Sequence, residues 1–416
     1  MAEGVGWPKP ARKKREDFPE TSLMPTESIQ AAASAYAYPL LIKQLLHTPL
    51  ATAADQEIVY RDSHRQTYRD LAARIRRLAN SLRDAGVGPG DTVAVMDWDS
   101  HRYLECFFAV PMMGAVLQTV NVRLSAEQIA YTLNHAKADV VLINREFIPL
   151  LKQIAPLLTN VRHFVLIDDD LSPVEEPVRF TTEYEALLAN ASPDYDFPDF
   201  DENAQATVFY TTGTTGLPKG VYFSHRQLVL HTLGVATNVG CAATQGRLHR
   251  EDVYMPITPM FHVHAWGFPY VATLLGLRQV YPGKYLPGSL LQLLREEKVT
   301  FSHCVPSILQ MLFAHPDFTR TDLTGWKVLI GGSAMSQALA SAAMKKGIDA
   351  LTGYGMSETC PVLTIAHLSS DDLQATDDEQ ATLRCKTGLP LPLVDLRIVT
   401  PEMTDVAHDG NATGEV

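Results

Sequence analysis

The stretch Val208-Phe-Tyr-Thr-Thr-Gly-Thr-Thr-Gly-Leu-Pro-Lys-Gly-Val221 says most about the fold and chemistry of this chain. An apolar strand candidate leads into a run of threonines and glycines and then into Lys219. Glycines let backbone N–H groups approach an anion closely, the threonine hydroxyls add donors, and the lysine supplies a mobile positive charge. The pattern therefore predicts a loop that holds a polyphosphate, in preference to a flexible surface loop.

The general Gly-x4-Gly-Lys-Ser/Thr phosphate loop does not fit this stretch. Counted from Gly213, Pro218 stands at the second glycine position and Gly220 at the hydroxyl position, so only Lys219 agrees. The 12 residues from Tyr210 to Val221 instead resemble, nearly continuously, the signature loop of the adenylate-forming (ANL) enzymes. These include acyl-CoA synthetases, luciferases and the adenylation domains of peptide synthetases.

The resemblance implies that this loop closes over the β- and γ-phosphates of ATP. The residues then expected to bind ATP are Thr211, Thr212, Gly213, Thr214, Thr215, Gly216 and Lys219. Lys219 is also expected to act in catalysis, and Thr211 to contribute to a Mg²⁺ site.

A second match, Gly353-Tyr-Gly-Met-Ser-Glu-Thr359, resembles the Tyr-Gly-x-Thr-Glu motif of the same family. By carry-over, Tyr354 stacks on adenine, Ser357 hydrogen-bonds the α-phosphate, and Glu358 holds Mg²⁺. The flanking Gly353 and Gly355 are also expected to bind the nucleotide. Serine replaces the family's usual threonine, and its hydroxyl group keeps the function. An aromatic face suits a purine, and a carboxylate suits a hard cation.

A third match is Gly331-Gly-Ser-Ala-Met335, between a strand candidate and a helix candidate. Backbone groups at such a turn can face a ligand. The resemblance places Gly331 beside the acyl group, and Gly332 and Ser333 beside the nucleotide. Without that context, a Gly-Gly turn would more often be purely structural.

A fourth match, Pro259-Met-Phe-His-Val-His-Ala-Trp-Gly267, resembles the carboxylate-binding segment of long-chain fatty acyl-CoA synthetases. The resemblance implies that His262 lies near the reacting carboxylate, and that Trp266 and Gly267 border the acyl tunnel, with Trp266 as its gate. The alternative for Trp266 is an ordinary core residue. Amino-acid-activating relatives carry Phe-Asp where this chain has Phe261-His262, so we expect an acid without an α-amino group.

The same histidines allow a second interpretation. His262 and His264, with His303 as a third ligand, could form a metal site, although no carboxylate or cysteine stands nearby in the sequence. The five cysteines are widely spaced and form no Cys-x-x-Cys pair, which favours scattered buried thiols over disulfides or a zinc ribbon.

Strand and helix candidates alternate along the chain. Thr92–Met96, 139–143, His163–Ile167 and Lys327–Ile330 read as short buried strands, and 103–113 reads as a helix. Ser125-Ala-Glu-Gln128 is a capping-box pattern, with Ile129, Leu133 and Ala136 on one face of the helix that follows. This predicts an α/β fold with parallel sheets covered by helices on both faces. Val394-Asp-Leu-Arg-Ile-Val399 alternates like a half-exposed strand, which suggests the start of a small antiparallel unit.

Two acidic stretches, 194–202 and 371–379, are interpreted as exposed loops at subdomain boundaries. The predicted organisation is a disordered tail at 1–25, a first αβ subdomain at 26–202, a second at 203–370 with the phosphate loop and adenine motif, and the start of a β subdomain at 371–416. The tail carries Arg12-Lys-Lys-Arg15, for which a weak peripheral membrane contact is the alternative reading.

Composition excludes several classes. The chain has 416 residues, of which 46% are hydrophobic, 20% are charged and 34 are aromatic, which does not describe a disordered or collagen-like chain. A net charge of −12 argues against non-specific nucleic-acid binding. The longest apolar run, 107–117, is too short to span a bilayer, so a cytoplasmic protein is expected, with membrane association as the alternative.

The chain ends at Thr413-Gly-Glu-Val416, inside what resembles the family's next motif. We therefore expect the large N-terminal part of a ligase, with the ribose-binding Asp, the hinge and the catalytic Lys of the C-terminal domain beyond it, and impaired activity of this part alone. The expected reaction is ATP-dependent activation of a medium- to long-chain fatty acid to an acyl-adenylate and its transfer to coenzyme A. The alternatives are a ligase for an aryl or short-chain acid and a nucleotide-binding module without ligase activity. A homodimer is a further expectation from the resemblance.

Overall fold

The computed structural model describes residues 29–170, 179–211, 216–242 and 245–416. The chain divides into a short unit, Met1–Tyr38, and a large unit, Pro39–Val416. The described residues of the short unit, 29–38, form no helix or strand. The predicted tail 1–25 lies outside the described residues, and the large unit carries all of the architecture below.

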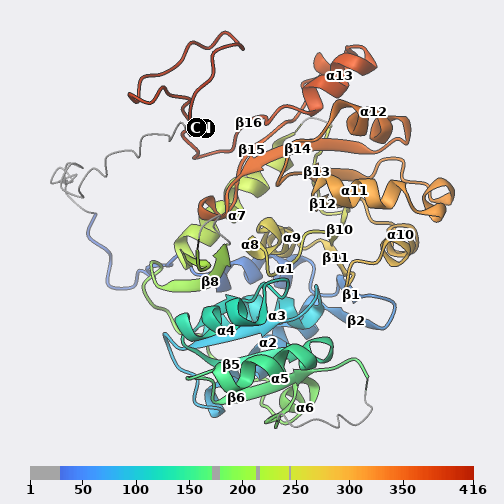
Figure 1. Cartoon of the computed structure of the whole chain (residues 1–416). Coiled ribbons are helices and arrows are strands. Elements are labelled where there is room, and N and C mark those ends of the chain that lie inside the picture. The colour runs from blue at the N-terminus through green and yellow to red at the C-terminus, as the bar shows by residue number, and fades with distance from the viewer. Residues whose placement is uncertain (1–28, 171–178, 212–215, 243–244) are drawn as a thin grey trace, which may run out of the picture. The chain divides into compact units, whose positions relative to one another are not determined.

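The large unit contains a seven-stranded sheet in which every neighbouring pair is parallel except β8 and β9 (Figure 1). In spatial order, its strands are β7 (Thr182–Glu183), β6 (His163–Ile167), β5 (Ala138–Asn144), β3 (Thr92–Met96), β4 (Val116–Thr119), β8 (Gln205–Thr211) and β9 (Lys219–Ser224).

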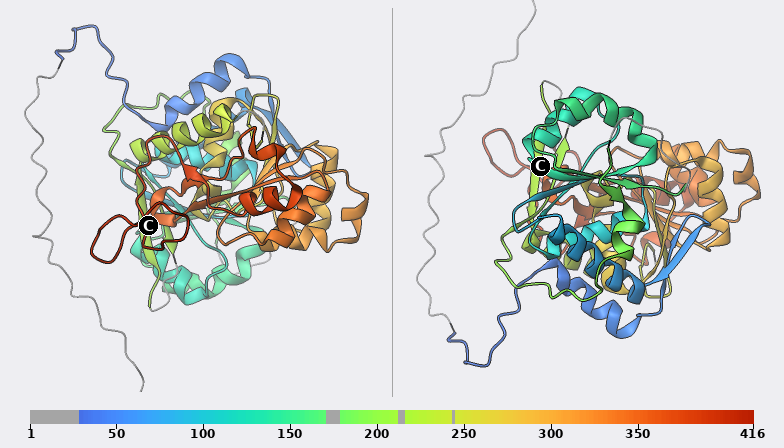
Figure 2. Two further views of the ribbon diagram at one scale, coloured as in Figure 1. Left: turned by 90° about the horizontal axis from the view of Figure 1, so that it is seen from above. Right: turned by 90° about the horizontal axis from the view of Figure 1, so that it is seen from below.

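Both faces of this sheet are buried, as continuous apolar strands require. Val93 and Val95 of β3 point into a core shared with α2 (Tyr68–Asp84) and α3 (His101–Met112). Ala94 and Met96 point the other way, toward α4 (Ala126–His135) and α5 (Ile148–Ile154). In the view from below in Figure 2, the strands lie between green helices on one side and blue helices on the other.

The second sheet has nine strands. Its two edges are antiparallel: one edge strand is antiparallel to its neighbour at one end, and the last three strands at the other end pair antiparallel in turn. In spatial order, the strands are β16 (Leu389–Pro390), β15 (Val362–Ile365), β14 (Asp349–Gly355), β13 (Lys327–Ile330), β12 (Phe301–Cys304), β10 (Val253–Pro256), β11 (Arg278–Tyr281), β1 (Glu57–Tyr60) and β2 (His64–Thr67). The six strands from β14 to β1 are mutually parallel.

Helices cover this sheet on both faces too. Met255 and Val328 pack in a core with α10 (Pro287–Glu296), α11 (Pro306–Phe313) and α12 (Gln337–Lys345). Tyr254 and Leu329 face the opposite core with α7 (His225–Cys241) and α9 (Phe268–Leu275). The predicted α/β fold with covered parallel sheets is thus confirmed.

The remaining helical segments are short. They are η2 (Ile42–Leu46), α1 (His47–Thr52), η3 (Arg145–Phe147), η4 (Ala155–Leu157), α6 (Tyr184–Ala189), α8 (Val263–Trp266), η5 (Pro316–Arg320), η6 (Ser357–Thr359), η7 (Asp372–Gln374) and α13 (Asp377–Arg384). No helix among the described residues is long and apolar enough to cross a membrane.

Several local predictions hold residue for residue. β3, β6 and β13 have the predicted bounds, and α3 covers nearly all of 103–113. Ser125 caps α4 as predicted: its hydroxyl accepts the Gln128 N–H, and the Gln128 side chain returns to the Ser125 N–H. Ile129 and Leu133 on that helix are buried.

Two local predictions were wrong. The acidic stretch at 371–379 is not wholly a loop, because Asp377, Asp378 and Glu379 form the first turn of α13. Thr376 and Glu379 make a capping box there, and acidic side chains at a helix N-terminus are favourable. The stretch 394–399 forms no regular strand: only Val399 makes isolated antiparallel bridges, to Asp405 and Glu415.

Sheet membership crosses the predicted subdomain boundary at residue 202. β8 and β9 follow that boundary in sequence yet complete the seven-stranded sheet, while β1 and β2 precede it and join the nine-stranded sheet. Hydrogen bonds also tie the acidic stretch at the boundary to its surroundings, since Glu202 accepts from the Leu40 N–H and from Arg226. The subdomain bounds themselves stay a prediction.

Candidate functional site

Three of the four sequence motifs meet in one pocket of about 210 Å³. Of the predicted site residues, eight line it: His262, Trp266, Gly331, Gly332, Gly353, Tyr354, Gly355 and Ser357. The pocket lies at the carboxyl ends of the parallel strands β13 and β14, which is where ligands bind in open α/β sheets. Its other lining residues, which the sequence did not single out, are Val263, Leu329, Met356, Pro361 and Val362.

The side of the pocket that is predicted to bind adenine, here called the adenine side, is built on regular strand ends. β13 and β14 pair in parallel with Ile330 opposite Thr352, which brings Gly331 next to Gly353. A Cβ atom on Gly331 would stand 3.0 Å from Cη2 of Trp266 and 3.3 Å from the Gly353 carbonyl oxygen. Only glycine therefore fits at residue 331 without moving the indole ring or the strand.

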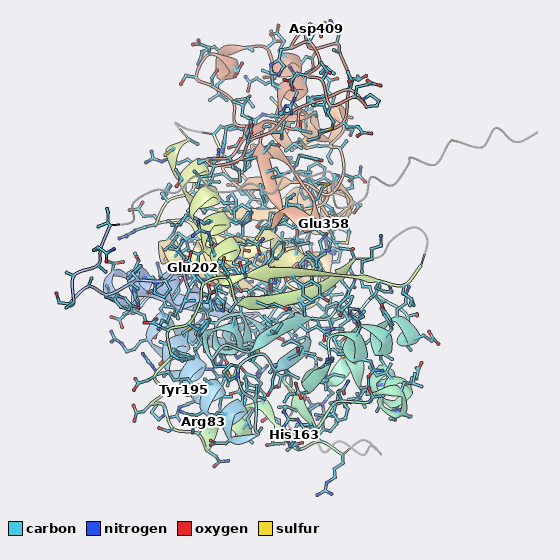
Figure 3. The ribbon with its side chains drawn as sticks, turned by 90° about the vertical axis from the view of Figure 1, so that its left-hand side faces the viewer. Arg83, His163, Tyr195, Glu202, Glu358 and Asp409 are labelled. Carbon is cyan, nitrogen blue, oxygen red and sulfur yellow. The ribbon has the colours of Figure 1, made fainter. Side chains whose placement is uncertain are left out.

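β14 then turns into an antiparallel pair with β15, with a register shift between Tyr354 and Gly355. A Cβ atom on Gly355 would stand 2.0 Å from the Pro361 carbonyl oxygen, so the backbone of the two strands is in close contact there. Tyr354 is half-buried and Ser357 opens η6, and both line the pocket. Glu358 follows on the exposed surface (Figure 3) and, like Ser333, is not a lining residue.

The side that is predicted to bind the acid, here called the acid side, is built on an unusual turn. Val263, His264, Ala265 and Trp266, the segment labelled α8 in Figure 1, have φ angles of 47°, 55°, 49° and 58°. This is one turn of left-handed helix made entirely of non-glycine residues, and each costs roughly 1–2 kcal/mol relative to a right-handed conformation. Such a turn persists only where surrounding contacts hold it.

Trp266 closes the pocket on this side. Its indole ring lies against Gly331, and the His303 ring packs beside it in a tilted arrangement, with the ring centroids 5.2 Å apart. The side chain is 6% exposed and belongs to a hydrophobic core, yet it also lines the pocket. Trp266 is thus a core residue that also forms a wall of the pocket, and its role as a gate stays a prediction.

His262 precedes the left-handed turn, and its side chain is accessible from the pocket. The surrounding protein lowers the pKa of His262 below its ordinary value, first by desolvation and second through the Arg123 guanidinium. A neutral imidazole suits a place next to a carboxylate that must remain a nucleophile, because it can donate one hydrogen bond without forming an ion pair.

The histidines do not form a metal cluster. His264 is buried among Phe107, Phe209 and Tyr270, and burial lowers its pKa to about 3. His303 packs in a different core and hydrogen-bonds the Tyr254 hydroxyl at 2.8 Å. Among the described residues, no group of three or more His, Cys, Asp or Glu could hold a metal ion, so the zinc-type interpretation of these histidines finds no support.

The predicted phosphate loop connects β8 and β9. The two strands pair with Thr211 opposite Lys219. The sequence analysis did not predict β9, because most of its residues are exposed or half-buried. Lys219 and Gly216 are exposed. The central loop residues, Thr212, Gly213, Thr214 and Thr215, lie outside the described residues. The ring of Phe209, two residues before the end of β8, packs edge-on against the His264 ring, with 5.5 Å between the ring centroids. The strand that leads into the loop therefore packs against the acid-side turn.

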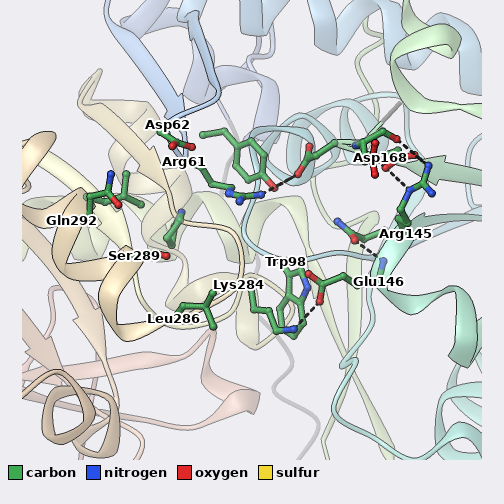
Figure 4. A pocket seen from close by; sticks show the side chains of 16 residues that line it. Arg61, Asp62, Trp98, Arg145, Glu146, Asp168, Lys284, Leu286, Ser289 and Gln292 are labelled. Atoms are coloured by element: carbon green, nitrogen blue, oxygen red, sulfur yellow. Dashed lines mark hydrogen bonds and ion pairs between the residues drawn. The ribbon is translucent and has the colours of Figure 1, made fainter. Parts of the chain in front are cut away.

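A second pocket of about 350 Å³ is larger but contains none of the predicted residues (Figure 4). It is lined by ion pairs that join the two sheets or neighbouring strand ends, among them Lys284 with Glu146 at 2.8 Å and Arg145 with Asp168. Each of its three cations, Arg61, Arg145 and Lys284, pairs with an acidic residue of the same pocket. The smaller pocket, where the motifs converge, is the candidate active site.

The cysteines form no disulfide. Cys106, Cys304 and Cys360 are buried, Cys385 is half-buried and Cys241 is exposed, so the prediction of scattered buried thiols holds for three of the five.

Fold and pocket define an α/β protein with a small-molecule site at the carboxyl ends of its strands. Residues 46–416 match the AMP-binding enzyme family. The chain belongs to this family.

Individual relatives agree. The chain is 43% identical over 355 residues to a long-chain-fatty-acid–CoA ligase of Thermus thermophilus, which covers 85% of this chain and 63% of that protein. It is 35% identical over 387 residues to a 3-methylmercaptopropionyl-CoA ligase of Ruegeria lacuscaerulensis, covering 91% of this chain and 70% of that protein. The chain thus spans less than two thirds of the length of the Thermus ligase.

The fold resembles that of the anthranilate CoA ligase AuaEII, solved with anthranoyl-AMP, at a TM-score of 0.77 and 21% identity, covering 89% of this chain and 68% of that one. At this identity the likeness concerns the fold alone.

Proposed function

We propose that this chain is the nucleotide- and acid-binding part of an AMP-forming acid–CoA ligase that activates a fatty acid. The observation that carries the proposal is the convergence of His262 and Trp266, the Gly331-Gly332 turn, and Tyr354 and Ser357 on one pocket. These residues come from segments that are about 90 residues apart in sequence at the widest. A structural role alone gives no reason for them to meet.

In the first step, a carboxylate oxygen of the acid attacks the α-phosphorus of ATP, and the bond to the β-phosphate oxygen breaks to release pyrophosphate. The acid is already ionised, so no side-chain base is needed and catalysis consists of positioning and charge stabilisation. We propose that Tyr354 stacks on adenine, Ser357 donates its hydroxyl to the α-phosphate, and Lys219 compensates charge on the leaving pyrophosphate.

The oxygen donors of Thr211 and Glu358 suit a magnesium ion that accompanies ATP. When bound, that ion supplies positive charge at the phosphates. In the second step, the thiol sulfur of coenzyme A attacks the acyl carbon, the bond to the AMP oxygen breaks, and the thiol proton is lost to solvent.

The small volume of the pocket informs the choice of acid. About 210 Å³ is below the ~300–1,000 Å³ of typical small-molecule sites, so nucleotide and acyl chain cannot both fit in the closed arrangement. For a fatty acid, Trp266 must therefore move away from Gly331, as a gate. A ligase for a short or aromatic acid, which needs less movement, is the second candidate, and the buried position of Trp266 is what favours it.

The test is exchange of labelled pyrophosphate into ATP by the intact enzyme, with acids graded from acetate to palmitate and including benzoate. Maximal exchange with medium- or long-chain acids supports the proposal, and maximal exchange with acetate or benzoate supports the second candidate. If no carboxylic acid drives exchange, the proposal is wrong and the protein is a nucleotide-binding module without ligase activity.

The remaining proposals concern location and assembly. We propose a cytoplasmic enzyme, and the alternative is a weak contact of Arg12 to Arg15 with anionic membrane surfaces. Deleting the first 25 residues should then lower binding to vesicles containing anionic lipid. A homodimer stays a prediction, and sedimentation of the intact enzyme tests it.

A further inference from the structure

Asp99 is a buried carboxyl group that joins three chain segments. Its Oδ1 accepts the Met260 N–H at 2.8 Å, its Oδ2 accepts the Tyr285 hydroxyl, and its backbone carbonyl accepts the Gly283 N–H at 2.8 Å. Asp99 follows β3 of the seven-stranded sheet, Met260 follows β10, and Gly283 and Tyr285 follow β11 of the nine-stranded sheet. One residue thus connects the carboxyl ends of strands in both sheets.

Met260 is the entry to the acid-side turn. The left-handed turn begins three residues later, and between them lies His262, which lines the pocket. The Phe261 carbonyl is held as well, by the Thr119 hydroxyl at 3.2 Å. A turn that is strained along its whole length depends on such anchors, because Val263, Ala265 and Trp266 do not favour positive φ.

The other end of the turn rests on α9 and α3. The Gly267 N–H bonds to the His264 carbonyl at 3.0 Å, and the Tyr270 hydroxyl bonds to the Phe107 carbonyl at 3.2 Å. With this end fixed by the packing of α9, release of the Met260 end is the change that would let the turn relax and carry Trp266 away from Gly331.

We propose that Asp99 is the positioning residue of the acid-binding turn: by holding the Met260 N–H, it sets the place of His262 and Trp266 against the Gly331-Gly332 turn. Asp99 itself touches no substrate in this scheme. The inference deepens the proposed function, on which its kinetic part rests, while its structural part does not need any activity.

Asp97 provides a matched control. It lies two residues away and is 0% exposed, as against 2% for Asp99. Asp97 also accepts three hydrogen bonds, from the Trp98 N–H, the Ser100 hydroxyl and the Asn144 side-chain amide. These donors lie at the ends of β3 and β5 in the seven-stranded sheet. Among the described residues, no hydrogen bond joins Asp97 to residues 259–267. Loss of Asp97 therefore removes a comparable buried network without releasing the turn.

The first test is amide hydrogen exchange of Asp99→Leu and Asp97→Leu in the 416-residue chain, compared at denaturant concentrations that give equal global stability. We expect the amides of 260–266 to exchange at least about tenfold faster in Asp99→Leu, because the Met260 N–H loses its acceptor and the turn its anchor. Asp99→Asn, which keeps an oxygen acceptor, should restore slow exchange. Equal exchange rates in the two leucine variants would overturn the proposal.

The second test is kinetic and uses the intact enzyme. Asp99→Leu should raise the KM for the acid about tenfold or more while the KM for ATP changes less than about twofold, and Asp97→Leu should leave both nearly unchanged. If Asp99→Leu fails to fold, Tyr285→Phe removes one donor only and should raise the KM for the acid in the same direction by a smaller factor. An equal rise in both KM values would contradict a positioning role.

The two proposals fail differently. If no acid drives exchange in the wild-type enzyme, the proposed function is wrong, but the hydrogen-exchange difference between Asp99→Leu and Asp97→Leu still decides whether Asp99 holds the turn.

Discussion

The two walls of the pocket are built in different ways. The adenine wall consists of Gly331 and Gly353, at the ends of two paired parallel strands, where regular hydrogen bonding fixes the backbone. The acid wall is the left-handed turn at Val263–Trp266, which is held through Asp99, a residue 161 positions from Met260. The first wall is determined by local sequence and strand pairing, and the second by long-range contacts. We therefore expect substitutions in the two walls to have different signatures.

The largest expected effect is on the phosphate side of the adenine wall. Glu358→Ala should lower adenylation by the intact enzyme ~10²–10³-fold, the typical cost of losing one preorganised charge-stabilising group. Exchange of labelled pyrophosphate into ATP measures this. Glu402, an exposed glutamate outside the pocket, gives the control Glu402→Ala, which should match the wild type. Wild-type exchange in Glu358→Ala would refute the assignment of Glu358.

Gly331→Ala tests the contact between the two walls. The added methyl group would meet the Trp266 indole at 3.0 Å, so we expect the ring to shift and the KM for the acid to change about tenfold, with ~1–3 kcal/mol lost from the free energy of unfolding. Gly240→Ala is the control, because a Cβ atom there meets nothing within 4 Å. If Gly331→Ala left acid kinetics and stability unchanged, the indole would not lie against the glycine.

The pH dependence of stability tests the anchor of the acid wall. Burial raises the pKa of Asp99 to about 8, from 3.8, so the native state keeps a proton that the unfolded state loses. The free energy of unfolding of the wild type should therefore fall, relative to Asp99→Asn, as pH rises from about 4 to about 8, and level off above.

Other groups near Asp99 are common to both proteins in this comparison. They are Asp97, Tyr103, Arg123, Tyr254, Tyr281 and Tyr285. Urea unfolding of the two proteins at a series of pH values measures the difference, and parallel curves would show that the pKa of Asp99 is not raised.

The smallest expected effect concerns the handedness of the turn. Ala265→Gly relieves a positive φ, which should offset the lost methyl group and leave the free energy of unfolding within about 0.5 kcal/mol of the wild type. Ala272→Gly, in the right-handed helix α9, should cost about 1–2 kcal/mol, from helix propensity and burial. Urea unfolding of both variants decides. Equal costs would mean that the turn is not left-handed in solution.

The sequence predicted the adenine wall well, because its signals are local. β13 and the Gly-Gly turn follow from a short apolar run and two glycines, and the cap of α4 from Ser125 and Gln128 alone. It could not predict the left-handed turn, because Val263 and Ala265 carry no signal for positive φ and the hydrogen bonds that hold the turn come from elsewhere in the chain. It also missed β9, whose half-exposed residues lack apolar periodicity.

The sequence also could not predict that β1 and β2 join the nine-stranded sheet, because this depends on a long-range contact. β1 pairs with β11, which lies more than 200 residues further along the chain, and no local pattern records that pairing; β2 joins the sheet through β1. Features that depend on neighbouring residues could be predicted, and features that depend on contacts between residues far apart in the sequence could not.

The most direct test of one shared pocket is calorimetric titration of this chain with a stable acyl-adenylate analogue, in which a sulfamoyl group replaces the phosphate and a fatty chain is the acyl group. The analogue should bind with one-to-one stoichiometry, far more tightly than AMP or the fatty acid, and each of these should compete with it. Gly331→Ala should weaken analogue binding more than AMP binding. Simultaneous binding of AMP and the analogue, with no competition between them, would contradict a single pocket formed by both walls.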